Sequence, residues 1–383
     1  MEKLIEYATS IQAKYIDAYI ELKSYRQVAK QFHVNEKTVR DAIKNVKLKA
    51  ALQGYSPEHD MTKAVPDGFL VKGVSTYYDD EGKPKGQWVK SSADKLRQQE
   101  ILKEAIEAMA EELPKVQPRQ GRLEVNEKLM AVYPIGDLHV GMLSWPEETG
   151  EEWDLKIAEE IQCSAMAKLV ELSPACEWAT IINLGDWFHY DNLEGVTTRS
   201  GHHLDTDGRY AKMARIGVKI MRQCIESALD KHAKVRVINV IGNHDDTSSM
   251  MLSICLANIY EREPRVIIDT SPNAFQYFRH GKVLVGCHHG HSTKPAALAG
   301  VMASDRSKDW GETEYRYWYI GHVHHQSVKD FAGCTVESFR TLAAKDAYSH
   351  WGGYRAPRDM KSIILHSEYG EVSRNTMNIG MLR

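Results

Sequence analysis

Five stretches of the sequence end an apolar run at a small residue and then offer aspartate, asparagine or histidine side chains. In the first, VYPIGDLHVG at 132–141, the run stops at Gly136, and Asp137 and His139 follow. We expect a buried strand that delivers these two side chains at its carboxyl end. Residues two apart in an extended backbone point to the same side of the chain, so Asp137 and His139 can bind one metal ion.

The same construction recurs four more times. The later copies are ATIINLGDWFHYDN at 179–192, VRVINVIGNHDD at 235–246, VLVGCHHGHS at 283–292 and YRYWYIGHVHH at 315–325. A single copy is adequately explained as a polar turn that closes a strand. Five copies, each with metal-capable residues in its first positions, instead predict one metal centre built from the ends of several strands.

The order of these motifs, GDxH, GD, GNHD, HGH and GHxH, resembles that of the calcineurin-like metallophosphoesterase superfamily over residues 128 to 330. The GDWFH at 185–189 is similar to the corresponding motif of the bacterial and archaeal double-strand-break repair nucleases in that superfamily. The resemblance implies a two-sheet αββα sandwich and the hydrolysis of phosphate esters. It leaves the substrate open, because members of the superfamily act on phosphoproteins, nucleotides and DNA.

The resemblance also implies two divalent metal ions that share a bridging carboxylate. The first ion would be bound by Asp137, His139, Asp186 and His324, and the second by Asp186, Asn243, His289 and His322. His289 is chosen as the first histidine of the HGH pattern, while His288 is expected on the opposite face of the strand. Imidazole, carboxylate and amide ligands together suit Mn, Fe or Zn better than Mg, and we expect Mn for a nuclease-like member.

Three further residues are candidates for catalysis. His244 follows the ligand Asn243, and its imidazole can protonate a leaving oxygen or stabilise the transition state. Asp245 is expected to orient His244. By the resemblance, His189 matches the histidine with which the repair nucleases engage a nucleotide strand. The alternative for His189 is a purely structural position.

Polar loops near these motifs supply candidates for phosphate binding. The insert at 193–210 and the loop at 351–359 both carry arginine, whose guanidinium group binds phosphate oxygens in pairs. The loop at 351–359 can equally be an exposed turn. The candidate residues are Arg199, His202, His203, Arg209, Arg355 and Arg358 in these loops, and His291 of the fourth motif.

The N-terminal residues are expected to form three helices. Apolar residues recur at helical spacing from the start of the chain, and YRQVAKQF at 25–32 precedes EKTVRDAIKNVKLKAAL at 36–52. A short helix, a tight turn and a longer helix resemble a helix-turn-helix. The last helix places Lys37, Arg40 and Lys44 opposite its apolar face, where they would contact DNA. The alternative is a docking or dimerisation domain with a solvated basic face.

These signals divide the chain into three parts. We expect a helix-turn-helix domain at 1–50, a linker with a hairpin and a helix at 51–127, and a metallophosphoesterase domain at 128–383. In the last part strands and helices alternate at first, with helices near 154–172 and 207–230, and strands predominate after residue 265. The predicted fold class is therefore multidomain α/β, with an αββα sandwich at its C-terminal end.

Composition limits where DNA could bind. The net charge is −3 over 383 residues, so any contact with nucleic acid must come from local basic patches. The six cysteines form no CxxC pair, which indicates a reducing compartment rather than a disulfide framework. No apolar run reaches transmembrane length, so we expect a cytoplasmic protein without a membrane partner.

The leading functional hypothesis is a metal-dependent DNA nuclease that its N-terminal domain brings to DNA. This arrangement resembles the composite enzymes of bacteriophages and prophages, which would place the protein in a host cytoplasm. One alternative is a phosphomonoesterase or protein phosphatase with an adaptor domain. Another is a DNA-bound regulator with a vestigial site. A homo-oligomer is compatible with each hypothesis.

Overall fold

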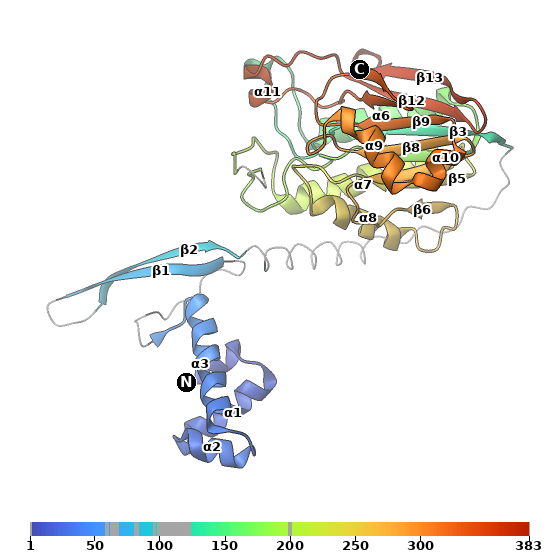
Figure 1. Cartoon of the computed structure of the whole chain (residues 1–383). Helices are drawn as coiled ribbons and strands as arrows, with labels where there is room; N and C mark the ends of the chain where they lie inside the picture. The colour runs from blue at the N-terminus through green and yellow to red at the C-terminus, as the bar shows by residue number, and fades with distance from the viewer. Residues whose placement is uncertain are drawn as a thin grey trace. The chain divides into compact units, whose positions relative to one another are not determined.

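The computed structural model describes residues 2–57, 61, 69–79, 84–94, 97, 124–197 and 201–382. The chain forms two compact units, Met1–Glu104 and Ala105–Arg383, whose elements are labelled in Figure 1. The hairpin that we expected in a connector belongs to the first unit, together with the N-terminal helices. Among the helices described, none is long and apolar enough to cross a membrane.

The first unit begins with a short 3-10 helix and three α-helices. These are η1 (Glu2–Tyr7), α1 (Ser10–Leu22), α2 (Tyr25–Gln31) and α3 (Glu36–Leu52). The helices share one hydrophobic core, which includes Ile16, Val28 and Val39, each 0% exposed. Asn35 caps α3, because its side chain accepts a hydrogen bond from the Lys37 backbone N–H at 2.9 Å. The expected short helix, turn and longer helix are therefore present.

A β-hairpin follows the three helices. Strand β1 (Phe69–Tyr78) pairs antiparallel with β2 (Pro84–Ala93), which confirms the predicted hairpin. The helix predicted after the hairpin lies outside the described residues, apart from Arg97.

Two mixed β-sheets form the second unit. The six-stranded sheet has the order β13 (Gly370–Asn378), β12 (Asp359–His366), β3 (Asn126–Ile135), β4 (Cys176–Asn183), β5 (Lys234–Asn239) and β6 (Val266–Ile268). The five-stranded sheet has the order β10 (Ser327–Phe331), β11 (Cys334–Ser338), β9 (Tyr315–Ile320), β8 (Val283–His288) and β7 (Gln276–His280). Strands β3 to β6 are parallel, and so are β8, β9 and β11.

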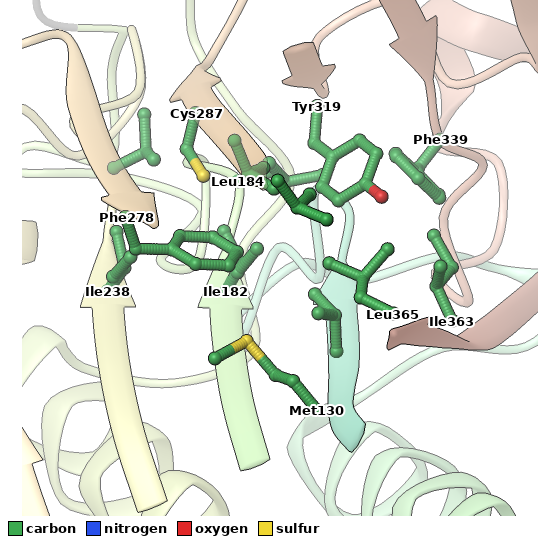
Figure 2. Close-up of a cluster of buried hydrophobic side chains, with 14 residues drawn as sticks. Met130, Ile182, Leu184, Ile238, Phe278, Cys287, Tyr319, Phe339, Ile363 and Leu365 are labelled. Carbon is green, nitrogen blue, oxygen red and sulfur yellow. The ribbon is translucent and has the colours of Figure 1, made fainter. Parts of the chain in front are cut away.

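The apolar faces of the two sheets pack on each other. Figure 2 shows Met130, Ile182 and Ile238 of one sheet facing Phe278 and Cys287 of the other. Helices α6 (Leu155–Leu172), α7 (Tyr210–Leu229) and α8 (Ser248–Ile259) pack on the six-stranded sheet, and α9 (Pro295–Asp305) packs on the five-stranded sheet. The order of layers is the αββα arrangement that was predicted.

Helices α8 and α9 and strand β10 are among the elements of the second unit that were not predicted. Helices α8 and α9 are rich in small and apolar residues around most of their circumference, so they lack the periodic polar face that indicates a helix. Strand β10, SVKDF, lies at the sheet edge and is largely polar. All three lie outside the motif-bearing strands.

A buried histidine links β3, β4 and the end of α7. His232 is 0% exposed, its Nδ1 accepts a hydrogen bond from the Cys176 N–H at 3.2 Å, and its Nε2 lies 2.8 Å from the Tyr133 hydroxyl. Because Nδ1 accepts, the neutral imidazole donates from Nε2 to Tyr133. Burial lowers the pKa of His232 from 6.5 to about 4.

We predict that His232 makes the fold sensitive to acid. A histidine whose pKa is lower in the folded state takes up a proton on unfolding, so stability is unaffected well above pH 6.5 and falls as the pH drops toward 4. Between about pH 7.5 and about pH 5, urea unfolding should show the wild type losing about 2 kcal/mol more than His232→Gln, which cannot titrate. Equal losses in the two proteins would show that another group is responsible.

Candidate metal centre

The motif-bearing strands end at a common edge of the two sheets. In the six-stranded sheet, Ile135 is in register with Asn183, and Asn183 with Asn239, so β3, β4 and β5 end together. In the other sheet, β8 and β9 end together at His288 and Ile320. The loops that leave these five strand ends carry the candidate ligands, as the sequence predicts.

Asp137, His139 and His324 form the first cluster, with one candidate ligand atom from each lying within 4.8 Å of the others. The Nε2 atoms of His139 and His324 are 3.4 Å apart, and His324 Nε2 is 3.5 Å from Asp137 Oδ1. Asp137 and His139 are buried, and His324 is partly exposed.

Asp186, His289 and His322 form the second cluster, under the same distance limit of 4.8 Å. His289 Nε2 is 3.1 Å from Asp186 Oδ2 and 3.0 Å from Asn243 Oδ1. His289 Nδ1 contacts the backbone oxygen of Leu184 at 2.8 Å. A carbonyl oxygen can only accept, so Nδ1 carries a hydrogen and Nε2 is turned toward Asp186 and Asn243.

The two clusters adjoin. The backbone N–H of His322 donates to both carboxylate oxygens of Asp137, each at 3.0 Å. The His139 backbone N–H donates to the Asp186 backbone oxygen at 3.0 Å, and His289 Nδ1 is 3.8 Å from Asp137 Oδ1. Asp137 of the first cluster therefore positions the backbone of His322 in the second. In turn, the backbone of Asp186 in the second cluster positions that of His139 in the first. Asp186 is grouped with the second cluster, and its role as a bridge between two ions stays a prediction.

Five of the candidate ligands have left-handed backbone conformations, which corrects the expected extended geometry of the Asp-x-His pair. The φ angles are 38° for Asp137, 48° for His139, 50° for Asp186, 68° for His322 and 53° for His324. Left-handed conformations of residues other than glycine cost about 1–3 kcal/mol each and gather at functional sites. The backbone turns sharply at these residues. The turns bring the side chains together, whereas the predicted mechanism was the alternation of side chains along an extended strand.

Glycine before a ligand permits this close approach. A Cβ on Gly242 would lie 2.1 Å from Asp186 Oδ1 and 2.3 Å from the Asp186 backbone nitrogen. Neither atom can move without shifting the candidate ligand Asp186 itself. The GNHD motif thus needs glycine so that the loops after β4 and β5 can touch.

His244 lies beside the first cluster. Its ring centroid is 5.0 Å from that of His139, and its Nδ1 donates to the His189 backbone oxygen at 2.8 Å. The backbone oxygen of His189, not Asp245, orients the ring, so the expected role of Asp245 is wrong. The buried Asp245 carboxylate instead accepts backbone N–H groups of Asp186, Phe188 and Gly242 at 3.0–3.2 Å.

His139, His189 and His244 form a third group of closely spaced side chains, in which His189 is buried. Its Nδ1 is 3.3 Å from His139 Nδ1, and its Nε2 is buried without a hydrogen-bond partner among the described residues. Burial lowers the pKa of His189 to about 3, His244 adds to this, and the carboxylate of Asp346 opposes it. His189 is therefore a neutral ring that faces the centre.

The charges of the centre favour a cation. Burial would raise the pKa of Asp186, but His289 outweighs it and holds that pKa well below its usual range. Burial would lower the pKa of His289, but the carboxylates of Asp186 and Asp137 raise it to about 10. Two buried carboxylates thus draw positive charge into a space lined by imidazole and amide groups. This donor set fits Mn, Fe or Zn.

The remaining histidines of the fourth motif differ in position. His288 is buried away from the clusters, with its ring stacked on Phe275 at 4.7 Å, as expected for a core residue. The His291 ring lies 5.3 Å from that of His289 and 6.2 Å from that of His322. His291 therefore remains next to the second cluster.

Arg358 does not have the predicted role in phosphate binding. It is 7% exposed, pairs with Glu151 at 3.2 Å and donates to the Leu342 backbone oxygen at 2.9 Å. Its guanidinium group also lies over the Trp153 ring at 5.3 Å. These contacts make Arg358 an internal support of its loop.

The other predicted phosphate contacts lie on the surface. Arg355 is exposed and donates to the backbone oxygens of His350 and Tyr354. In the insert, His202, His203 and Arg209 are exposed, and none belongs to a cluster described above. Arg199 lies outside the described residues.

Thr341 supports the centre and was not predicted. Its hydroxyl donates to the Asp137 backbone oxygen at 2.8 Å and accepts from the Ala343 N–H at 2.8 Å. Thr341 follows β11, whose sequence has no metal-capable ending, so no local signal marks it.

No protein-family model and no curated protein matches the chain. Among solved structures, an uncharacterised Streptococcus pneumoniae protein titled a predicted phosphoesterase is 10% identical at a TM-score of 0.30, over 67% of this chain and 92% of that chain. A zinc complex of Vps29 from Entamoeba histolytica is 13% identical at a TM-score of 0.28, over 65% and 99%. An archaeal phosphodiesterase is 15% identical at a TM-score of 0.32, over 65% and 100%. Scores this low define neither family nor activity, so function is inferred from the site itself.

We predict that Asp186→Asn loses metal but keeps its fold. The amide oxygen can still accept the His244 backbone N–H, which Asp186 Oδ1 accepts at 2.8 Å, but the negative charge is gone. Bound Mn, measured by plasma emission, should fall from about two ions per chain to one or none, with an unchanged circular dichroism spectrum. Asp305→Asn, an exposed carboxylate outside the clusters, is the control. Two retained ions in Asp186→Asn would refute the site.

Proposed function

We propose that the chain is a metal-dependent phosphodiesterase that cleaves DNA. The observation that supports this best is the pair of adjoining His/Asp clusters with His244 beside them, all at the ends of parallel strands. Two bound divalent cations, for which we propose Mn, would polarise a phosphate ester and activate water. The chain's own residues then have to place the substrate and supply a proton to the leaving oxygen.

His244 is suited to proton transfer. Its Nδ1 is fixed on the His189 carbonyl oxygen at 2.8 Å, so Nε2 is the atom left to act on a substrate. The residue is partly exposed, which makes that atom accessible from solvent. A ring held at one nitrogen keeps its direction when the other nitrogen gains or loses a proton.

The N-terminal unit supports DNA over a phosphoprotein as the substrate. Lys37, Arg40 and Lys44 are all exposed on α3. Arg40 pairs with Glu36 at 2.8 Å, whereas Lys37 and Lys44 form no ion pair with a described residue. An exposed basic helix face can bind DNA phosphates. The same face on a docking domain is the main alternative, which would favour a phosphomonoesterase or protein phosphatase.

The first experiment compares cleavage of several substrates in the presence of different metal ions. Purified full-length protein is incubated with labelled single- and double-stranded DNA, with bis-nitrophenyl phosphate and with nitrophenyl phosphate, in Mn, Mg, Zn or EDTA. We expect Mn-dependent cleavage of DNA and of the diester, and little cleavage of the monoester. Preference for the monoester would favour the phosphatase alternative, and no cleavage at all would favour a vestigial site.

We predict that His244→Ala slows DNA cleavage by about two to four orders of magnitude while bound metal is unchanged, because proton transfer is lost. Nitrophenolate leaves without much help from a proton, so the loss on bis-nitrophenyl phosphate should be smaller. His325→Ala changes an exposed histidine that follows the candidate ligand His324 but belongs to neither cluster, and it should keep full activity. Equal losses of His244→Ala on both substrates would exclude proton transfer as its role.

We predict that the α3 face controls DNA affinity. Replacing Lys37, Arg40 and Lys44 together by alanine should lower the salt dependence of DNA binding by about one counterion per lost cation. Hydrolysis of bis-nitrophenyl phosphate should be unchanged, because that small diester needs no such face. A triple variant of Lys14 in α1, Lys30 in α2 and Lys49 near the end of α3, all exposed, loses equal charge as a control. Unchanged DNA affinity with an altered mass in light scattering would identify an assembly domain instead.

A further inference from the structure

A short helix after β11 exposes aromatic side chains to solvent. In α11 (Ala347–Trp351) Tyr348 is 78% exposed and Trp351 is 80% exposed, and Tyr354 in the following turn is 52% exposed. The same unit buries Trp153, Trp187 and Trp318 completely. Gathered aromatic rings left in water mark interaction sites rather than unfinished cores.

A fourth exposed aromatic ring comes from a neighbouring segment. Trp145, which precedes α5 (Pro146–Thr149), is 58% exposed. The Ser144 hydroxyl donates to the Lys345 backbone oxygen at 2.6 Å, and the Lys345 N–H donates to Glu151 at 3.3 Å. Helices α5 and α11 are in contact, so Trp145 and the α11 aromatic residues belong to one region of the surface.

This region begins at the metal centre. Thr341, whose hydroxyl supports the Asp137 backbone oxygen at 2.8 Å, leads directly into the segment that carries α11. Asp346, five residues after Thr341, caps α11 by accepting the Ser349 N–H at 2.8 Å. On the other side, Trp145 lies six residues after His139. Both segments that carry the exposed aromatic residues therefore start next to residues of the metal centre.

A cationic group accompanies the rings. The Arg355 guanidinium donates to the backbone oxygens of His350 and Tyr354 at 3.2 and 2.8 Å, and it forms no ion pair with a described residue. The Tyr354 ring lies over Gly352, where a Cβ would come within 2.7 Å of it. The turn is thus held by its own contacts, and the Arg355 charge remains available to an anion.

We propose that Tyr348, Trp351, Tyr354 and Trp145 form a stacking platform for the unpaired bases of a single-stranded nucleic acid whose backbone enters the metal centre. Aromatic rings beside a cation bind single strands without sequence preference, because every base offers a flat face and every linkage a negative charge. The platform deepens the proposed phosphodiesterase function and rests on it. The platform implies that the bases of the substrate are unpaired near the bond that is cleaved.

The charge favours this occupant over a second copy of the chain. Aromatic and arginine side chains are enriched at protein interfaces as well, so the rings and Arg355 do not by themselves select the occupant. The region also leads to carboxylate and imidazole groups suited to a cation that would bind phosphate, and a strand of nucleic acid uses both features. A copy of the chain remains an outcome that the experiment can reveal.

The test measures binding without cleavage, with full-length protein in EDTA. Fluorescence anisotropy compares labelled dT20, rU20 and an abasic DNA strand with the same number of phosphates. Wild type should bind dT20 or rU20 more tightly than the abasic strand, and the relative affinities of the first two show which sugar is preferred. Trp351→Ala should weaken binding of the base-bearing strand by about tenfold and leave the abasic strand unchanged, as expected for one lost stack.

Trp351→Phe, which keeps an aromatic face, should retain most of the affinity. Trp88→Ala, which removes a ring 65% exposed on the hairpin of the other unit, is the matched control. Hydrolysis of bis-nitrophenyl phosphate by Trp351→Ala should be normal, and this assay separately tests the proposed function. Equal affinity of wild type and Trp351→Ala for the base-bearing strands would overturn the platform. A change only in mass by light scattering would overturn it in favour of an interface between copies.

Discussion

The buried carboxylate of Asp245 is the contact on which the centre depends. It accepts backbone N–H groups from the loop after β4, at Asp186 and Phe188, and from its own loop after β5, at Gly242. Gly242 can then approach Asp186 so closely that no side chain fits between them. Without this carboxylate, buried backbone donors of both loops would be left without partners, which is costly in a protein interior. The geometry of the second cluster therefore follows from a residue that belongs to neither cluster.

The ligand types and the strands that carry them were predictable because both signals are local. An apolar run followed by Gly-Asp or Gly-His reports a strand end and a metal-capable side chain within a few residues. Parallel strands end at one edge, so the clustering of Asp137, His289 and His322 follows once the sheets are assumed. The resemblance to a known superfamily supplied the αββα layers, which the packing of the two sheets matches.

The parts that could not be predicted depend on contacts between distant residues. Asp245 looks like a partner of His244 in sequence, yet its carboxylate is directed at backbone groups of another loop. Arg358 looks like a free cation in a polar loop, yet Glu151, far away in the sequence, neutralises it. Aspartate and histidine are enriched in the left-handed backbone conformation but adopt it at only a minority of positions, so the residue types alone do not mark Asp137 and His139 as left-handed.

The location of β3 has a consequence for how the candidate centre would acquire metal ions. This strand lies between β4 and β12, which approach it from opposite ends of the second unit's sequence, and Asp137 directly follows it. The first cluster also needs His324, so no continuous fragment that ends before the second sheet contains a complete site. Folding must therefore close long-range contacts before an ion gains its full set of ligands, a route that is intrinsically slow. Metal uptake at this candidate centre would then be a late event that secures an assembled fold, and chelation would weaken the whole unit rather than one loop.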